Sequence, residues 1–511
     1  MRQTSLFIKN GTNEIILDFS NNPNLQYICC DEGQLSAVQN TVNTLGYTNC
    51  NVNTYCSFTP GGTFYTIQGS NKFDSNNNGC DANDLALPNV KFNITNGTVN
   101  GSFISNNSGN YNIPVQAGTH TITPQLENPT YFTVTPASTQ VIFPVTPSPF
   151  MQNYCIAPTG VHQDLEVVFA PINPARPGFD ATYRLVYKNK GNQVMNGTIN
   201  LTFQDEVLDL VSTSLATSSQ QTNQLNWAFN NLLPLQTRFI DLVFNVNSPQ
   251  ETPAVNNGDQ LNFVATINPI TGDEIPNDNT SSLKQIVVGS YDPNDITCLE
   301  GPQELPENIG DYLHYVIRFE NTGTYAAENV VVKTIINPAH YNINSLQFLN
   351  SSHNTYTRIT GNVVEFIFEN INLAAASGGG GGGHGHVIIK IKPNNSLEVN
   401  SSVTSQANIY FDYNFPIVTN EETTVFQNLS INDNPLLEVS IFPNPVKDIL
   451  QLQSKEMIQN IELYDVQGRI LEATQVNSEK VSHNISHRNN GIYFVKISTE
   501  LGTKTVKIIK N

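Results

Sequence analysis

The sequence predicts a mainly β protein built from tandem immunoglobulin-like β-sandwich domains. Charged residues make up only 13% of the 511-residue chain, well below the roughly 25% of an average globular protein. Short runs that alternate apolar and polar residues recur between clusters of turn residues. Two central stretches, 179–192 and 310–324, also repeat one another. These features favour several small sandwiches in series, and the length allows about three to five domains.

Residues 1–56 carry a different pattern, which resembles the end of a leucine-rich repeat array. Residues 6–8 are apolar, residues 16–19 read Ile-Leu-Asp-Phe, and residues 17–25 read Leu-Asp-Phe-Ser-Asn-Asn-Pro-Asn-Leu. Asp31 can cap a following helix that ends at Gly46, with an apolar face formed by Leu35, Val38, Val42 and Leu45. The resemblance implies a leucine-rich-repeat C-terminal cap at the N-terminus of the chain, with the rest of the array upstream of Met1.

The first nine residues contain no apolar core of the length found in signal peptides. If the protein is exported, as the motifs of its last 74 residues described below imply, it needs such a signal, and we then expect the chain to be a truncated form or a fragment of a longer product. No apolar run reaches the roughly 18 residues of a membrane span, so no span is predicted.

Seven cysteines are present, and disulfides such as Cys50–Cys56 are plausible outside the cell, although the spacing leaves the pairing open.

Residues 57–148 are predicted to form a β-sandwich that resembles Cna B-like surface domains. A loop at its start offers oxygen ligands at alternate positions before a glycine, as a calcium loop requires: Asp74, Asn76, Asn78, Asp81 and Asp84. The closing glutamate of an EF-hand is absent, because Leu85 occupies that position. Calcium is therefore one interpretation of this loop, and a turn rich in Asp and Asn without an ion is the other.

Residues 149–286 and 287–426 are predicted to form two immunoglobulin-like sandwiches. Each stretch has a long alternating strand, an aromatic strand and a closing apolar strand in the same order. The second copy, and less clearly the first, resembles the DUF11-like conserved-repeat domain. One departure is the glycine tract Gly378–Gly383, which precedes His384 and His386. A glycine tract is typical of a flexible linker, and no metal site is predicted at the two histidines.

Residues 427–437 read as a polar linker, and residues 438–511 as a small all-β sandwich. Its turns and terminal strand resemble the type A sorting domain of the type IX (Por) secretion system, through Pro443, Asn444, Pro445, Gly468, Arg469, Gly491, Tyr493, Lys507 and Lys510. The resemblance implies outer-membrane export in a Bacteroidota-type bacterium, with the type IX machinery as a partner and a secreted or cell-surface location. The lysines of the last strand are expected to present charge to the export receptor.

The net charge of the chain argues against some classes of binding partner. The chain has 43 acidic and 24 basic residues, a net charge of −19, and residues 438–511 are almost neutral with 8 acidic and 9 basic residues. The negative charge therefore belongs to residues 1–437, which argues against nucleic acid and anionic membranes as partners.

No nucleophile elbow, zinc-protease helix or phosphate loop is found, so no catalytic residue and no cofactor besides calcium is predicted. We expect a non-catalytic exported surface protein that adheres to an extracellular protein or glycan. The alternative is the stalk and sorting region of an exported enzyme whose catalytic domain lies upstream of Met1.

Overall fold

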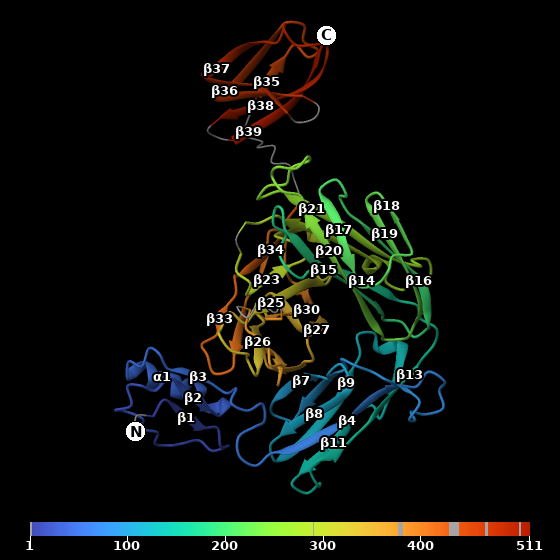
Figure 1. The fold of residues 1–511 in the computed structure, drawn as a ribbon, viewed down its shortest axis with the longest axis vertical. Helices are drawn as coiled ribbons and strands as arrows, with labels where there is room; N and C mark the ends of the chain where they lie inside the picture. The colour runs from blue at the N-terminus through green and yellow to red at the C-terminus, as the bar shows by residue number, and fades with distance from the viewer. Residues whose placement is uncertain (1–2, 290, 377–381, 429–438, 466–468, 500–501) are drawn as a thin grey trace. The chain divides into compact units, whose positions relative to one another are not determined.

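The computed structural model describes residues 3–289, 291–376, 382–428, 439–465, 469–499 and 502–511. The chain divides into two compact units, residues 1–427 and 428–511, which are considered separately below. The predicted mainly β class is confirmed, because strands dominate both units (Figure 1). Gly378–Gly381 of the predicted glycine tract lie outside the described residues. No helix among the described residues is long and apolar enough to cross a membrane.

The first module, residues 3–60, is a small parallel sheet covered by one helix. Its strands pair in the order β1-β2-β3, with Ser5 opposite Tyr27 and Tyr27 opposite Asn51. The elements are β1 Ser5–Ile8, β2 Tyr27–Cys30, η1 Glu32–Gln34, α1 Leu35–Thr44 and β3 Asn51–Asn53. The predicted helix and its apolar face are confirmed, since Val38 and Val42 are buried against the sheet and Leu35 and Leu45 pack beside them.

Two local expectations in this module are wrong. Asp31 does not cap the helix with its side chain; its carboxylate accepts hydrogen bonds from the backbone N–H groups of Asn10 and Gly11 at 3.0 and 2.9 Å. Cys56 pairs with Cys29 instead of Cys50. Neighbouring residues of a strand face opposite sides, so Cys30 enters the module's core together with Cys50, while Cys29 lies on the opposite face, where it is buried and bonded to Cys56.

The second module, residues 65–158, is a sandwich of two sheets around Ile67, Phe92, Tyr111 and Ile156. It extends beyond the expected boundary at residue 148, because β13 pairs with β4 and β10. Its elements are β4 Tyr65–Phe73, β5 Leu85–Ala86, β6 Lys91–Thr95, β7 Asn100–Ile104, β8 Asn110–Val115, β9 Gly118–Gln125, η2 Pro129–Tyr131, β10 Phe132–Thr135, β11 Thr139–Phe143, β12 Phe150–Met151 and β13 Tyr154–Pro158.

The third module, residues 159–288, is a sandwich with strand orders β14-β15-β20-β17 and β18-β19-β16-β21-β22. Trp227 is fully buried in its core. Its elements are β14 Leu165–Pro171, β15 Asp180–Asn189, β16 Met195–Thr202, β17 Leu208–Thr213, β18 Ser219–Gln221, β19 Gln224–Leu232, β20 Thr237–Val246, β21 Gln260–Asn268, η3 Pro276–Asn279 and β22 Thr280–Ile286.

The fourth module, residues 292–426, repeats this topology with the orders β23-β25-β30-β27 and β28-β29-β26-β32-β33, and adds the small sheet β24-β34-β31. Its elements are β23 Asp295–Cys298, β24 Gln303–Glu304, η4 Pro306–Asn308, β25 Leu313–Glu320, β26 Val330–Ile335, β27 Tyr341–Ser351, β28 Tyr356–Thr360, β29 Val363–Phe368, β30 His384–Pro393, β31 Ser402–Ser405, β32 Ala407–Phe411, β33 Ile417–Val418 and β34 Glu422–Phe426.

The modules of the first unit are joined to one another rather than strung out in series. Strand β7 of the second module pairs with β28 of the fourth, with Ser102 opposite Ile359, so one nine-stranded sheet runs through both modules. Val316 and Ile388 of the fourth module also enter the core of the third. Their sheet is therefore covered on both faces, which explains why nearly every residue of β25 and β30 is buried, including Arg318 and Lys390.

The described residues of the second unit form five paired strands: β35 Val439–Phe442, β36 Ile449–Tyr464, β37 Ile470–Asn484, β38 Gly491–Thr499 and β39 Gly502–Lys510. Strand β36 is long enough to serve two partners: its first half pairs with β35 and its second half with β38. The register with β37 shifts between these halves. One apolar core, which includes Leu450, Leu463, Val495 and Ile508, holds the unit together.

Candidate functional site

The Pro443-Asn444-Pro445 turn of the second unit is fastened to the last strand. Asn444 accepts a hydrogen bond from the backbone N–H of Ile509 at 2.9 Å and donates one to the carbonyl of Lys507 at 2.9 Å. Just beyond the turn, the N–H of Val446 donates to the Ile509 carbonyl at 2.8 Å. The last strand is thus held by β38 on one edge and by this turn on the other, which joins two motifs that lie about 60 residues apart in the sequence.

The remaining residues of the predicted sorting motif have structural partners of their own. Arg469 is largely exposed and pairs with Asp465, with 2.7 Å between Nε and Oδ2. Gly491 begins β38 and lies opposite Lys510, and the Tyr493 hydroxyl donates to the Asn489 carbonyl at 2.8 Å. Gly468 lies outside the described residues. These contacts shape the turns at the ends of β36, β37 and β38.

The two lysines of the terminal motif differ in exposure. Lys507 is exposed, whereas Lys510 is only 6% exposed and its ammonium donates to the Asn511 carbonyl at 2.8 Å. The alternation of β39 places Lys510 on the same face as the buried Ile508. The expectation that both lysines present charge to a receptor is therefore wrong for Lys510, and Lys507 is the member of the pair that a receptor can reach.

The predicted calcium loop folds into two adjoining turns. Asp74 is buried, and its two oxygens accept the N–H groups of Asn78 and Gly79 at 3.2 and 2.8 Å; Asn76 also accepts from Asn78, at 3.1 Å. In the second turn, Asp84 accepts from the N–H of Asp81 at 2.7 Å.

The structure does not gather the carboxylates of Asp74, Asp81 and Asp84 into a cluster among the described residues. A disulfide between Cys80 and Cys155 fastens the loop to β13. The calcium assignment therefore stays a prediction, and the hydrogen bonds within the loop are those of turns rich in Asp and Asn.

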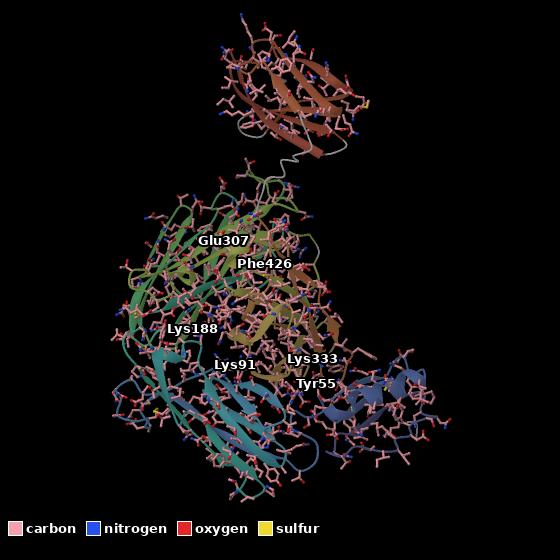
Figure 2. The ribbon with its side chains drawn as sticks, turned by 180° about the vertical axis from the view of Figure 1, so that it is seen from behind. Tyr55, Lys91, Lys188, Glu307, Lys333 and Phe426 are labelled. Carbon is pink, nitrogen blue, oxygen red and sulfur yellow. A yellow bond between two sulfur atoms is a disulfide. The ribbon has the colours of Figure 1, made fainter. Side chains whose placement is uncertain are left out.

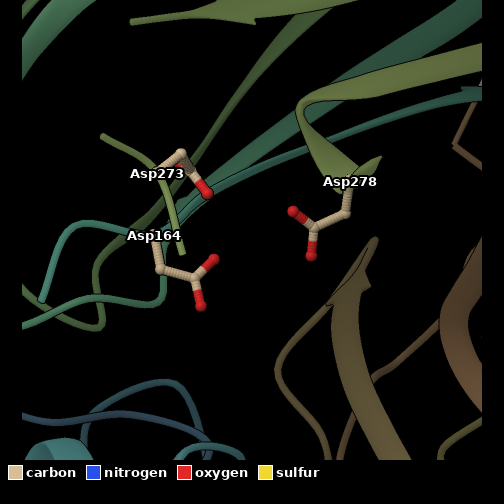
Figure 3. A group of neighbouring side chains, drawn as sticks. All are labelled: Asp164, Asp273 and Asp278. Carbon is tan, nitrogen blue, oxygen red and sulfur yellow. The ribbon is translucent and has the colours of Figure 1, made fainter. Parts of the chain in front are cut away.

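Within the described part of the chain, one group of three carboxylates has oxygens within 4.8 Å of one another: Asp164, Asp273 and Asp278. Figure 3 shows the three side chains turned toward a common space. Lys190 supplies positive charge there, since its ammonium lies 3.1 Å from Asp164 and also pairs with Asp278. The group is therefore an ion-pair network that already contains its cation.

The carboxyl groups of this network are shifted by burial. Burial raises the pKa of Asp164 to about 6, against the opposing effect of Lys190. Burial, together with the charge of Glu166, raises the pKa of Asp278 to about 7. Burial by itself lowers the pKa of Lys190, but the surrounding carboxylates outweigh it and raise that pKa overall. Lys190 therefore stays charged, while each of the two aspartates loses its proton to solvent as the pH rises through the mildly acidic to neutral range.

A second buried ion-pair cluster lies where three modules meet. Lys390 of the fourth module is fully buried and contacts Glu127 of the second module at 2.6 Å and Glu166 of the third at 2.5 Å. Lys188 lies 3.3 Å from Glu127, and the Tyr312 ring lies 4.4 Å from the Lys390 ammonium. Burial raises the pKa of Glu127, but the lysines outweigh burial and lower it overall. This cluster fixes the modules relative to one another inside the first unit.

Sequence reasoning missed both ion-pair clusters. Their members come from distant parts of the chain, as the pair Glu127 and Lys390 illustrates. The one local signal was that Lys188 lies near the end of β15 and Lys190 just after it, in a chain with only 13% charged residues. A buried position for these lysines requires acidic partners, but the sequence does not identify them.

Two family models match parts of this chain. Residues 292–425, which make up the fourth module, match a domain of unknown function, DUF7619. Residues 440–511 match the secretion system C-terminal sorting domain. The chain therefore ends in a sorting domain of the type IX secretion system, and the protein is secreted or displayed on the cell surface.

No curated protein matches this chain. Among solved structures it is similar to a CARDB domain from Pyrococcus furiosus, at 18% identity, 26% coverage of this chain, 99% of that chain and a TM-score of 0.18. The major pilin subunit of Bacillus cereus has 7% identity, coverages of 83% and 96% and a TM-score of 0.18. The collagen-binding domain of a Staphylococcus aureus adhesin has 13% identity, with 27% of this chain and 99% of that chain covered and a TM-score of 0.19. Scores this low establish no function for this chain.

Proposed function

We propose that this protein is a non-catalytic surface protein that the type IX system exports through residues 438–511 and that adheres to an extracellular protein or glycan through residues 1–427. The sorting-domain match at residues 440–511 carries the export part of the proposal. The interlocked modules of the first unit support a binding role, because a nine-stranded sheet and buried ion pairs fix side chains of different modules in one arrangement.

The first module supports the proposal of a leucine-rich-repeat end. Its three strands are parallel and begin a little over twenty residues apart, a spacing found in leucine-rich repeats, which run about 20–29 residues. Helix α1 covers one side of the sheet core. We propose that this module continues such an array and that the fourth module performs the role of a DUF11-like spacer.

The export role is tested with a reporter that carries a Sec signal and residues 427–511 in a type IX-competent host. Deleting residues 506–511 is expected to strand the reporter in the periplasm. That deletion also removes the strand to which Asn444 and Val446 bind, so it tests folding and recognition together. Substituting an exposed residue separates the two effects.

Lys507→Glu reverses an exposed charge on the last strand, and Lys480→Glu makes the same charge change at an exposed position of β37. We expect Lys507→Glu to reduce secretion several-fold with an unchanged melting temperature, and Lys480→Glu to secrete normally. Equal secretion of the intact reporter and the reporter without residues 427–511 would contradict the sorting role.

A further inference from the structure

A crevice of about 810 Å³ lies where the first, second and fourth modules meet. This volume falls within the roughly 300–1,000 Å³ of pockets that hold small ligands, and such pockets occur preferentially at domain junctions. Tyr55 comes from the first module, Phe103 and Val99 from the second, and Tyr410 and Lys333 from the fourth. Figure 2 labels Tyr55 and Lys333 close together at this junction.

Aromatic side chains form part of the apolar lining of the crevice, beside aliphatic ones, and they pack across the module boundaries. Tyr55 packs against Tyr410 with ring centroids 4.9 Å apart, and Phe103 stacks on Tyr356 at 5.5 Å. Tyr356 and Tyr410 are only partly buried. Parts of both rings therefore remain available to the apolar face of a ligand.

The polar lining offers hydrogen-bond donors. Asn53 is 4% exposed, and its side-chain oxygen already accepts from the Tyr27 hydroxyl at 2.7 Å and the Tyr55 N–H at 3.0 Å. Its amide nitrogen has no hydrogen-bond partner among the described residues. A buried donor without a partner costs about 1–3 kcal/mol. Because Asn53 lines the crevice, a ligand oxygen can supply the missing acceptor.

A row of charges on the sheet adds to this donor character. Lys333, Glu365 and Arg358 lie opposite one another on β26, β29 and β28. Both oxygens of Glu365 are used, one by the Tyr55 hydroxyl at 2.7 Å and one by Arg358 Nε at 2.8 Å. The row thus presents two cations and one satisfied carboxylate, which suits a ligand with several acceptor oxygens.

The backbone of the crevice wall is not open to an added peptide strand. Strands β7 and β28 pair with each other along Gly101–Ile104 and Thr357–Thr360, so neither offers a free edge there. Recognition at this wall therefore depends on side chains. The combination of partly exposed tyrosine rings, an unpartnered amide donor and cationic groups matches a sugar ring, which has an apolar C–H face bordered by oxygens.

We propose that this crevice binds a short oligosaccharide, with Asn53, Arg358 and Lys333 donating to its oxygens and Tyr356 and Tyr410 packing against a sugar face. This inference deepens the adhesive role proposed above and rests on it. The binding measurement uses purified protein and no export step. A failure to bind therefore leaves the export proposal intact, and a failed reporter export leaves the binding result unaffected.

The test is isothermal titration of the full chain with cellotetraose, xylotetraose, mannotetraose and tetragalacturonate, which separate neutral from acidic sugars. We expect at least one of them to bind with a Kd between about 10 μM and 1 mM. Val99 lines the crevice and is 54% exposed, so Val99→Trp fills the space without disturbing a core. This variant should weaken binding at least about tenfold.

Val145→Trp is the matched control, because Val145 lies in the same module, is 83% exposed and does not line the crevice. Its binding and melting temperature should equal those of the unchanged protein. The proposal is overturned if none of the four sugars binds at about 5 mM, a concentration above the expected Kd range. It is also overturned if Val99→Trp binds as tightly as the control, or if reduced casein binds in the crevice and no sugar does.

Discussion

The third and fourth modules share one fold but use one equivalent edge of it differently. Their strand orders match strand for strand, and a matching loop follows β15 and β25. In that loop the Asn189 amide donates to the carbonyls of Gln193 and Leu232, and the Asn321 amide donates to those of Tyr325 and Leu373. The repeat seen in the sequence is thus a repeat of hydrogen bonds as well as of strands.

The difference lies in the first strand of the five-stranded sheet. In the third module this strand is β18, three exposed polar residues whose one partner among the described strands is β19. In the fourth module it is β28, five residues that pair with β29 on one side and with β7 of the second module on the other. Short, polar edges resist further pairing, whereas longer β-branched ones invite it. The composition of one edge strand therefore decides whether a module ends at solvent or joins its neighbour.

The largest expected effect comes from removing the charge at the junction of the modules. Lys390→Met leaves Glu127 and Glu166 buried without their shared cation. Breaking a buried ion pair in this way costs about 3–5 kcal/mol. Urea unfolding should show a large fall in the midpoint of the first unit. Lys392→Met is the control, because Lys392 is only partly buried and contacts the same Tyr312 ring, at 4.7 Å. An equal fall of the urea midpoint in both variants would contradict the role of the cluster.

Disturbing the joined edge should cost less. A Cβ atom on Gly101 would lie 2.8 Å from the carbonyl oxygen of Ile359 across the β7–β28 pairing. Gly101→Val must therefore push the strands apart, at a cost of about 1–3 kcal/mol. Ser219→Val on the free edge strand β18 should change stability by less than about 0.5 kcal/mol. Thermal unfolding of both variants measures the contrast, and similar melting temperatures would show that the β7–β28 pairing contributes little.

The ion-pair network of the third module predicts a pH dependence that the fourth lacks, because Thr322 occupies the position of Lys190 in the matching loop. Asp278 has a pKa of about 7 in the folded state, raised from its usual 3.8. A raised carboxyl pKa stabilises the fold below the unfolded pKa, and this contribution is lost as the pH rises through about 7.

Asp278→Asn should therefore flatten the decline in stability between pH 5 and pH 8 by roughly 1–2 kcal/mol. Urea midpoints measured across this range, for the variant and the unchanged protein, provide the check. The lowered pKa of Glu127 acts in the opposite direction, below its usual range, and so leaves this window unaffected. Identical slopes for the two proteins would rule out Asp278 as the source of the decline.

The smallest expected effect concerns calcium. Calcium at millimolar concentration, typical of extracellular modules, should raise the melting temperature of the second module by a few degrees at most, and Asp84→Asn should abolish the rise. Asp74 is a poorer test residue because its oxygens already hold the loop through Asn78 and Gly79. An unchanged melting temperature at about 10 mM calcium would end the calcium interpretation.

Local pattern accounts for what the sequence predicted. The helix face of Val38 and Val42, the repeated strands and the turn at Asn444 all depend on residues close together in the chain. The pairing of Ser102 with Ile359 and the contact of Lys390 with Glu127 join residues more than 200 positions apart. Several edge strands of the chain could pair with a strand such as β28 equally well. Composition therefore predicts that an edge strand is available for pairing, but not which strand pairs with it.

The disulfide and the buried lysine show the same limit. Cys29, Cys50 and Cys56 lie close enough in sequence for either pairing, and the outcome is that Cys50 enters the core of the module while Cys29, on β2, pairs with Cys56. Lys510 looked exposed as part of a charged terminal strand, but the alternation of β39 places it on the buried face. Both outcomes depend on strand register, which the local sequence leaves open at these positions.

Amide hydrogen exchange of the unaltered protein tests the central comparison most directly. If β28 is an inner strand of a nine-stranded sheet, the amides of Tyr356–Thr360 exchange as slowly as those of its neighbour β29, and the amides of Ser219–Gln221 in β18 exchange much faster. Fast exchange along both β28 and β18 would contradict the account, because it would mean that the second and fourth modules are not joined through this edge.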